Sequence, residues 1–120
     1  MHYDQAGLIL VTRNYEACCA FYRETLGLPQ MFQLDRPGSV LTGFDLGGTY
    51  LMVEPGRAEG QAGSPVTLRF NVEDVERAAE VLTARGVAVN IARNPWGITA
   101  EFFDPDGNRC ALRSTAGFGE

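Results

Sequence analysis

Apolar runs, helical stripes and turn residues alternate along the first half of the chain in an order typical of a mixed α and β fold. An apolar run at residues 7–11 predicts a buried strand. Asn14 can cap a helix whose apolar side chains recur at helical spacing until Gly27 ends it. Turn residues such as Gly47 and Gly48 then separate short strands. The predicted strands of this half are 7–11, 29–35, 40–46 and 49–54.

The second half repeats this order after a segment without apolar periodicity. Residues 55–65 are rich in Gly, Pro and Ala and predict a linker. Asp74 can cap an amphipathic helix that Gly86 ends, because apolar residues recur there at i, i+3, i+4 and i+7. The predicted strands of this half are 66–72, 87–91, 98–103 and 108–113.

Three landmarks recur at a nearly constant offset, which indicates an internal repeat. The capping residues Asn14 and Asp74 differ by 74 − 14 = 60 positions, and Gly27 and Gly86 differ by 59. The hairpin glycines Gly48 and Gly107 also differ by 59. The sequence therefore predicts an α+β fold made of two tandem βαβββ modules in a single domain over residues 1–120. Module one covers about 6–54, the linker about 55–65 and module two about 66–113, followed by a short C-terminal tail.

Composition narrows the classes of function. The chain has 120 residues, 45% hydrophobic and 21% charged, with a net charge of −5, which fits one globular domain. All ten Lys and Arg residues are Arg and they are scattered, so no nucleic-acid interface is expected. No apolar run approaches the roughly 20 residues that span a bilayer, and the N-terminus lacks a signal-peptide pattern. We expect a cytoplasmic protein with no membrane partner.

The spacing of the cysteines matches neither a disulfide framework nor a metal-binding motif. Cys18, Cys19 and Cys110 make no C-x-x-C spacing and are odd in number, which argues against disulfides and a zinc knuckle. A nucleophilic cysteine would need a base, and the only imidazole is that of His2. We expect small buried thiols.

Two segments carry a resemblance to a known family. Residues 20–28 (AFYRETLGL) and the turn Asp104-Pro105-Asp106-Gly107-Asn108 resemble the first-helix signature and the closing turn of the vicinal oxygen chelate superfamily. That superfamily includes glyoxalases, bleomycin-resistance proteins and dioxygenases. The resemblance covers nearly the whole chain and implies βαβββ modules whose curved mixed sheets enclose a cleft, usually within a homodimer.

The resemblance also implies where a metal would bind in the metal-dependent members. Their ligands come from the first and last strands of each module, and the corresponding positions here are Gly7, Met52, Thr67 and Ala111. None of these residues is a usual ligand of a divalent metal, and a shift of one residue does not supply a set of ligands. We expect no metal and no cofactor. A carboxylate site for Mg²⁺ built from Glu54 and Glu101 remains an alternative.

Alternation along the strands assigns the side chains expected to line the cleft. They combine aromatic and apolar surface with a few charges, which suits a flat organic ligand. Trp96 and Phe103 could equally belong to the core or a dimer interface. The expected ligand-binding residues are Tyr50, Met52, Thr67, Arg69, Trp96, Glu101, Phe103, Arg109 and Ala111.

The sequence thus favours a metal-independent small-molecule binding protein similar to the bleomycin-resistance branch, acting as a homodimer without bond chemistry. The expected ligand is an aromatic or drug-like small molecule, such as an antibiotic that the protein sequesters. Two alternatives stay open. One is a glyoxalase-like lyase or dioxygenase, or a metal-free enzyme with Glu54 or Glu101 as a general base. The other is an interaction domain whose cleft is filled by side chains.

Overall fold

A computed structural model describes residues 1–37, 39–56 and 66–115. The chain divides into two compact units, Met1–Gln61 and Ala62–Glu120. We call them module one and module two and describe each by itself. Most of the expected linker, residues 57–65, and the C-terminal tail from residue 116 lie outside the described residues.

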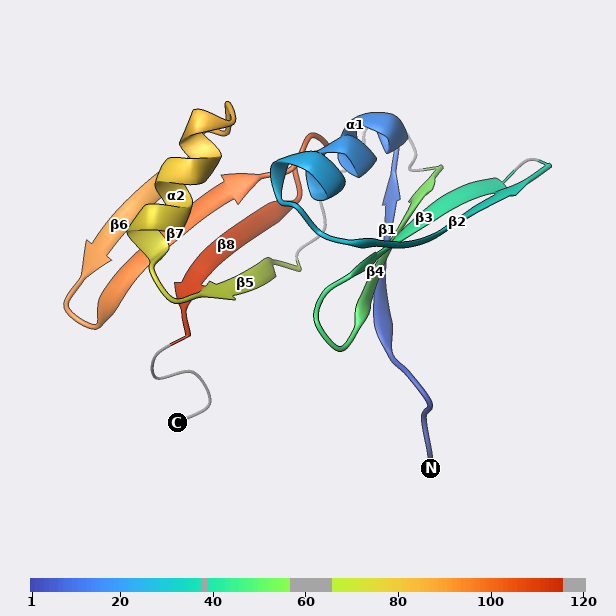
Figure 1. Ribbon diagram of the computed structural model, residues 1–120, viewed down its shortest axis with the longest axis horizontal. Helices are drawn as coiled ribbons and strands as arrows, with labels where there is room; N and C mark the ends of the chain where they lie inside the picture. Colours follow the sequence, from blue (N-terminus) through green and yellow to red (C-terminus); the bar gives the residue numbers. More distant parts are fainter. Residues whose placement is uncertain (38, 57–65, 116–120) are drawn as a thin grey trace. The chain divides into compact units, whose positions relative to one another are not determined.

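Module one is a four-stranded sheet with one helical segment (Figure 1). The strand order is β1-β4-β3-β2. The first and last strands, β1 and β4, pair in parallel, and the other pairs are antiparallel. The elements are β1 (Gly7–Thr12), α1 (Tyr15–Ala20), the π-helical turn η1 (Phe21–Thr25), β2 (Gln30–Arg36), β3 (Ser39–Asp45) and β4 (Tyr50–Pro55).

Module two repeats this architecture with the equivalent strand order, β5-β8-β7-β6. Strands β5 and β8 pair in parallel, and β6, β7 and β8 pair antiparallel. The predicted tandem βαβββ repeat is therefore confirmed. The elements are β5 (Leu68–Val72), α2 (Val75–Ala84), β6 (Asn90–Asn94), β7 (Gly97–Phe103) and β8 (Arg109–Ser114).

Two predicted strands differ from the structure by two residues or more at a boundary. Thr67 was expected within a strand but precedes β5, which starts at Leu68. The strand expected at residues 87–91 is displaced to Asn90–Asn94. The reason is the short turn at Pro95 and Trp96, which pairs Asn94 directly with Gly97 and so extends β6 to the turn.

The two helical segments differ in how they begin and end. The Asp74 side chain caps α2 by accepting a hydrogen bond from the Arg77 N–H at 3.1 Å. Asn14 makes no side-chain capping bond to α1. The first helix also ends in a π turn, in which the Leu26 N–H donates to the Phe21 carbonyl at 2.9 Å. A π turn accommodates one extra residue.

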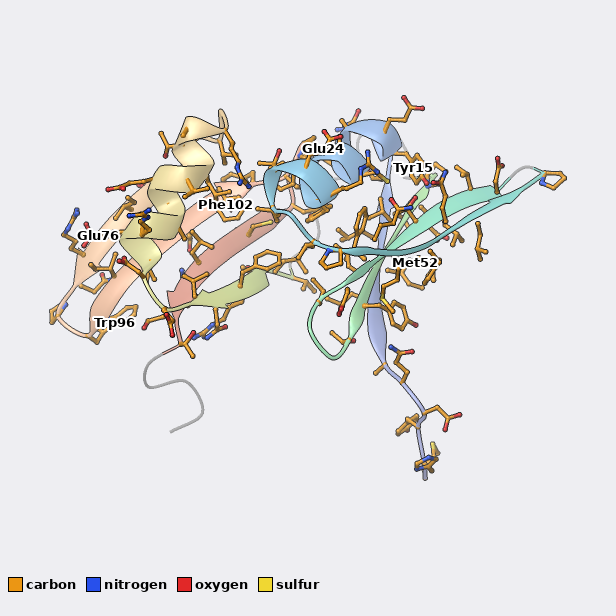
Figure 2. The ribbon with its side chains drawn as sticks, in the orientation of Figure 1. Tyr15, Glu24, Met52, Glu76, Trp96 and Phe102 are labelled. Atoms are coloured by element: carbon orange, nitrogen blue, oxygen red, sulfur yellow. The ribbon has the colours of Figure 1, made fainter. Side chains whose placement is uncertain are left out.

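The core of each module lies between its helix and one face of its sheet. In module one the buried side chains include Tyr22, Phe44, Leu51 and Val53, all 0% exposed. In module two they include Phe102 and Cys110, both 0% exposed, with Leu68, Ala79, Leu82 and Leu112; Figure 2 marks Phe102 on β7. The strand at residues 7–11 was expected to be buried, but its Leu8, Ile9 and Val11 side chains are 39%, 57% and 42% exposed, because β1 is an edge strand of its sheet.

A buried carboxylate organises the turn between β7 and β8. Asp104 is only 4% exposed. Its side chain accepts hydrogen bonds from the Asp106 N–H at 2.9 Å, the Asn108 N–H at 2.8 Å and the Asn108 side-chain amide at 2.8 Å. The Gly107 N–H donates to the Asp104 carbonyl at 3.0 Å. The turn is therefore a structural element whose polar groups are used within the turn itself.

Candidate functional site

The sheet face of module one that points away from the helix is mainly apolar and aromatic. Strand pairing places Ile9 opposite Met52, Met52 opposite Gly43, and Gly43 opposite Phe32, so these residues form one row across the sheet. Tyr50 lies in the neighbouring row, opposite Gly7 on β1. The structure thus brings the expected site residues Tyr50 and Met52 onto one face; Figure 2 marks Met52 there.

Two glycines on this face lie under aromatic rings. A Cβ atom built on Gly7 would lie 2.5 Å from the Tyr50 ring, and one built on Gly43 would lie 2.4 Å from the Phe32 ring. Both distances are too short for a side chain, so each ring occupies the space that a side chain at the glycine would need. The two glycines therefore let aromatic rings lie flat on the sheet, which suits the binding of a planar group.

The corresponding face of module two is rich in arginine. Arg69 lies opposite Ala111, which lies opposite Glu101, and Arg109 lies opposite Phe103. These five expected site residues share one face because strand residues alternate between faces. Arg69, Arg109 and Phe103 are exposed, whereas Ala111 is only 2% exposed. Ala111 thus lies between long side chains as part of the floor of this face.

Two further residues on this face were not in the expected site. Arg113 Nη2 lies 3.5 Å from Glu101 Oε1, and the Asn71 side chain accepts a hydrogen bond from Arg69 Nε at 3.3 Å. Asn71 in turn donates to the Ser114 carbonyl at 3.3 Å. Strand alternation already placed Asn71 and Arg113 on this face, so the sequence held the signal for both. Asn71 therefore orients the Arg69 side chain, and Arg113 forms an ion pair with Glu101.

Trp96 does not join this group. It lies at the β6–β7 turn (Figure 2) and Phe103 lies at the other end of β7. At about 3.3 Å per strand residue, the two are about 20 Å apart, so one small ligand cannot contact both. Trp96 is 75% exposed and borders a hollow of about 490 Å³ near the start of α2. The lining residues are Glu73, Asp74, Val75, Glu76, Trp96, Gly97, Ile98 and Ser114.

The residues at the four positions where the resemblance implies metal ligands do not fit a metal. Gly7 has no side chain and its space is covered by the Tyr50 ring. Ala111 is buried and has no donor atom, and Met52 and Thr67 are not usual ligands of hard or borderline divalent ions. Among residues 1–37, 39–56 and 66–115, no group of three or more His, Cys, Asp or Glu side chains could hold a metal ion.

One phenol on the helix side of module one has an altered acidity. The Tyr15 hydroxyl shares a hydrogen bond with the Thr42 hydroxyl across the helix–sheet boundary. Burial raises the pKa of Tyr15, and the hydrogen bond with Thr42 partly opposes that rise. This group lies on the opposite side of the sheet from Met52 and serves the packing of α1.

The three cysteines are buried and form no disulfide, as expected. None of the described helices is long and apolar enough to cross a membrane.

The repeated strand order and the helix on one face of each sheet define the class of tandem βαβββ proteins. A family model described as the Glyoxalase/Bleomycin resistance protein/Dioxygenase superfamily matches residues 2–112. The chain belongs to this superfamily, which confirms the resemblance found in the sequence. No sequence among curated proteins matches the chain.

Solved structures share the fold at low sequence identity. A lactoylglutathione lyase from Agrobacterium tumefaciens is 22% identical with a TM-score of 0.74, and the alignment covers 100% of both chains. The fosfomycin resistance protein FosX from Mesorhizobium loti is 16% identical with a TM-score of 0.72, covering 94% of this chain and 92% of that chain. FosX from Listeria monocytogenes, complexed with Mn(II) and sulfate, is 17% identical with a TM-score of 0.73, covering 95% and 93%.

Proposed function

We propose that the protein binds a small aromatic or drug-like molecule without a metal ion, as a homodimer in the cytoplasm. The feature that carries the proposal is the residue type at the four positions where the family resemblance implies metal ligands, which are Gly7, Met52, Thr67 and Ala111. The position of Gly7 supports the proposal further, because the Tyr50 ring occupies the space that a metal-binding side chain would need there. The proposal gives the protein the role of holding its ligand, as an antibiotic-sequestering protein does, with no bond broken.

The exposed faces of the two sheets support a binding role. Module one offers flat aromatic and apolar surface at Tyr50, Phe32 and Met52. Module two offers Phe103, 60% exposed, opposite the charged Arg109. Apolar surface with a few placed charges is the usual composition of small-molecule sites.

Two observations support the proposed assembly and compartment. The edge strand β1 exposes apolar side chains on both of its faces, with Leu8 39%, Ile9 57% and Val11 42% exposed, and such surface often marks an interface between chains. The buried thiols of Cys18, Cys19 and Cys110, which form no disulfide, fit a reducing compartment. Light scattering of the purified protein tests the dimer directly; a monomer at micromolar concentration contradicts it.

Metal analysis combined with a ligand screen tests the function. We expect protein purified from cells grown with added Mn, Ni, Zn and Fe to carry far less than one equivalent of any of them. Treatment with a chelator should leave the melting temperature unchanged. A panel of aromatic compounds and antibiotics should include ligands that raise the melting temperature. Stoichiometric metal, or a panel without any ligand, contradicts the proposal.

An enzyme of the same superfamily is the second candidate. Solved relatives are named as a lactoylglutathione lyase and as fosfomycin resistance proteins, one of them with Mn(II). Such activity here would need Glu54 or Glu101 to act as a general base, although Glu101 already pairs with Arg113. Turnover of a tested substrate that is lost in Glu101→Gln, with the fold retained, would favour this candidate.

A further inference from the structure

A row of uncharged side chains crosses the sheet face of module one that points away from the helix. Strand pairing orders this row, from β1 through β4 and β3 to β2, as Ile9, Met52, Gly43 and Phe32. Three strand spacings of about 4.8 Å make the row about 14 Å across, which is long enough for a molecule of two or three fused rings. The row at the same pairing positions of module two contains no aromatic ring and consists of Arg69, Ala111, Glu101 and Asn90.

The glycine in the row of module one is not required by the backbone. Gly43 lies within the interior strand β3, and its φ is not positive, so a residue with a side chain can adopt the same backbone conformation. Glycine weakens a strand, and within one it often marks a position that another group approaches closely. At Gly43 that group is the Phe32 ring, whose three nearest atoms would lie no more than 2.9 Å from a Cβ atom.

The Phe32 ring covers Gly43 with its face. A ring that pointed its tip at Gly43 would bring only Cζ close to the Cβ position, whereas Cζ and both Cε atoms of Phe32 are close. The Tyr50 ring covers Gly7 in the same way, with its three nearest atoms 2.5–2.6 Å from the Cβ position. The Phe32 ring therefore lies flat on the sheet, and because Phe32 is half-buried, part of its surface stays open to a ligand.

A bulge in β2 directs the Phe32 side chain. Gln30 pairs with Phe44 and Phe32 pairs with Gly43, so β2 advances two residues where β3 advances one. The extra residue is Met31, which is 49% exposed. Bulges re-aim side chains and are over-represented next to functional sites. The bulge on β2 and the glycine on β3 thus act together to seat one ring.

The seated ring borders a thioether. Gly43 pairs with Met52, so the ring that covers Gly43 lies beside the half-buried Met52 side chain, and sulfur contacts the edges of aromatic rings favourably. We propose that Phe32 and Met52 form a platform for the flat face of an uncharged fused aromatic ring system, with Gly43 as the positioning residue that lets the Phe32 ring lie flat. The proposal rests on the small-molecule binding function proposed above and specifies its ligand class.

Calorimetric titration with naphthol and its saturated counterpart decalol tests the platform. Both compounds are uncharged and carry one hydroxyl group on a frame of two fused rings, but only naphthol is flat and aromatic. Decalol is the more apolar of the two, so burial of apolar surface alone favours decalol. We expect naphthol to bind about fivefold more tightly, because stacked aromatic rings gain affinity beyond that of the buried area.

Variants locate the platform and separate positioning from stability. Phe32→Leu should remove the preference for naphthol while keeping an apolar side chain. Gly43→Ala should weaken naphthol about fivefold and decalol much less, because the added methyl group displaces the Phe32 ring. In the Phe32→Leu background, Gly43→Ala should change the preference no further. Tyr3→Leu is the matched control and should keep the preference, because it removes a ring that is 72% exposed and precedes β1.

The outcomes separate this proposal from the proposed function. Decalol that binds as tightly as naphthol, or equal weakening of both compounds by Gly43→Ala, overturns the platform while small-molecule binding stands. A changed oligomeric state of Gly43→Ala with unchanged naphthol binding also overturns it and assigns the face to a contact between copies of the chain.

Two further outcomes are decisive as well. Melting temperatures check that each variant folds; if Gly43→Ala does not fold, a preference for naphthol that persists in Phe32→Leu overturns the platform. If neither compound binds, the platform is contradicted, and the ligand panel described above decides whether the protein binds other small molecules.

Discussion

The two modules share a topology but differ in the chemistry of their exposed sheet faces. On the helix side, apolar residues recur at matching positions: Leu51 and Val53 in β4 correspond to Cys110 and Leu112 in β8, and all are buried. On the other side, module one presents aromatic rings over glycines, whereas module two presents arginines. The buried face is constrained by packing against the helix, whereas packing places no such constraint on the chemistry of the open face.

The turns before the last strand of each module show a second contrast. Asp45 ends β3 and Asp104 directly follows β7, and each side chain accepts a hydrogen bond from the N–H two residues further on. Asp104 is buried and accepts three hydrogen bonds. Asp45 is half-buried, and its side chain accepts one from the Gly47 N–H at 2.7 Å. The turn aspartate therefore stabilises module two through three hydrogen bonds, whereas in module one it contributes a single bond.

The largest predicted effect follows from that contrast. Asp104→Ala should lower the free energy of unfolding by about 3 kcal/mol, because buried donors lose a charged acceptor. The matched variant Asp45→Ala should cost about 1 kcal/mol. Urea unfolding followed by circular dichroism measures both. Equal losses for the two variants would show that burial of the turn carboxylate does not matter.

The helix caps give the next effect. Asp74→Ala should cost about 1 kcal/mol, because it removes the side-chain acceptor for the Arg77 N–H. Asn14→Ala should cost less than half as much, since Asn14 makes no side-chain capping bond. Urea unfolding again provides the comparison, and an equal cost for the two variants would contradict it.

A smaller effect concerns the glycine under the Tyr50 ring. Gly7→Ala should destabilise the protein by less than about 1 kcal/mol, because the far end of the ring can shift to make room for a methyl group. In a Tyr50→Ala background the same substitution should cost nothing. The double-mutant cycle measures this coupling; a coupling of zero would mean that the ring does not lie over Gly7.

The smallest effect appears only in alkali. Burial raises the pKa of Tyr15 above its ordinary value of 10.0, so the folded state resists ionisation more than the unfolded state does. The stability linked to this group is therefore fully present below pH 10.0 and is lost as the pH rises through the folded pKa. Module two has Val75 and Ala100 at the positions of Tyr15 and Thr42. Stability measured above this pH should fall less steeply in Tyr15→Phe than in the wild type.

Much of the fold could be predicted because buried positions recur at the helix and strand periods, and because turns contain characteristic residues such as Gly, Pro, Asn and Asp. The offset between the halves fell from 60 at Asn14 and Asp74 to 59 at Gly27 and Gly86. That change of one residue is the π turn η1, which the apolar spacing alone did not distinguish from a regular helix. The strand β6 was misplaced because its residues are mostly exposed at a sheet edge, where apolar periodicity carries little information.

The candidate site was predictable in part for the same reason. Alternation correctly placed Tyr50 with Met52, and Arg69 with Ala111, Glu101, Phe103 and Arg109, on shared faces. It could not place Trp96, because a turn residue has no strand period. Nor could it reveal the Tyr50 ring over Gly7, which depends on the side-chain rotamer. Whether these residues contact a ligand stays a prediction.

The hydrogen-bonded Asp104 turn also bears on the order in which module two folds. It closes the hairpin of β7 and β8 locally, whereas β5 must cross about forty residues of sequence to reach β8. Local contacts carry a lower entropic cost of loop closure and tend to form before distant ones. We therefore expect the hairpin to be structured in the folding transition state, so that loss of the Asp104 carboxylate slows refolding more than it speeds unfolding.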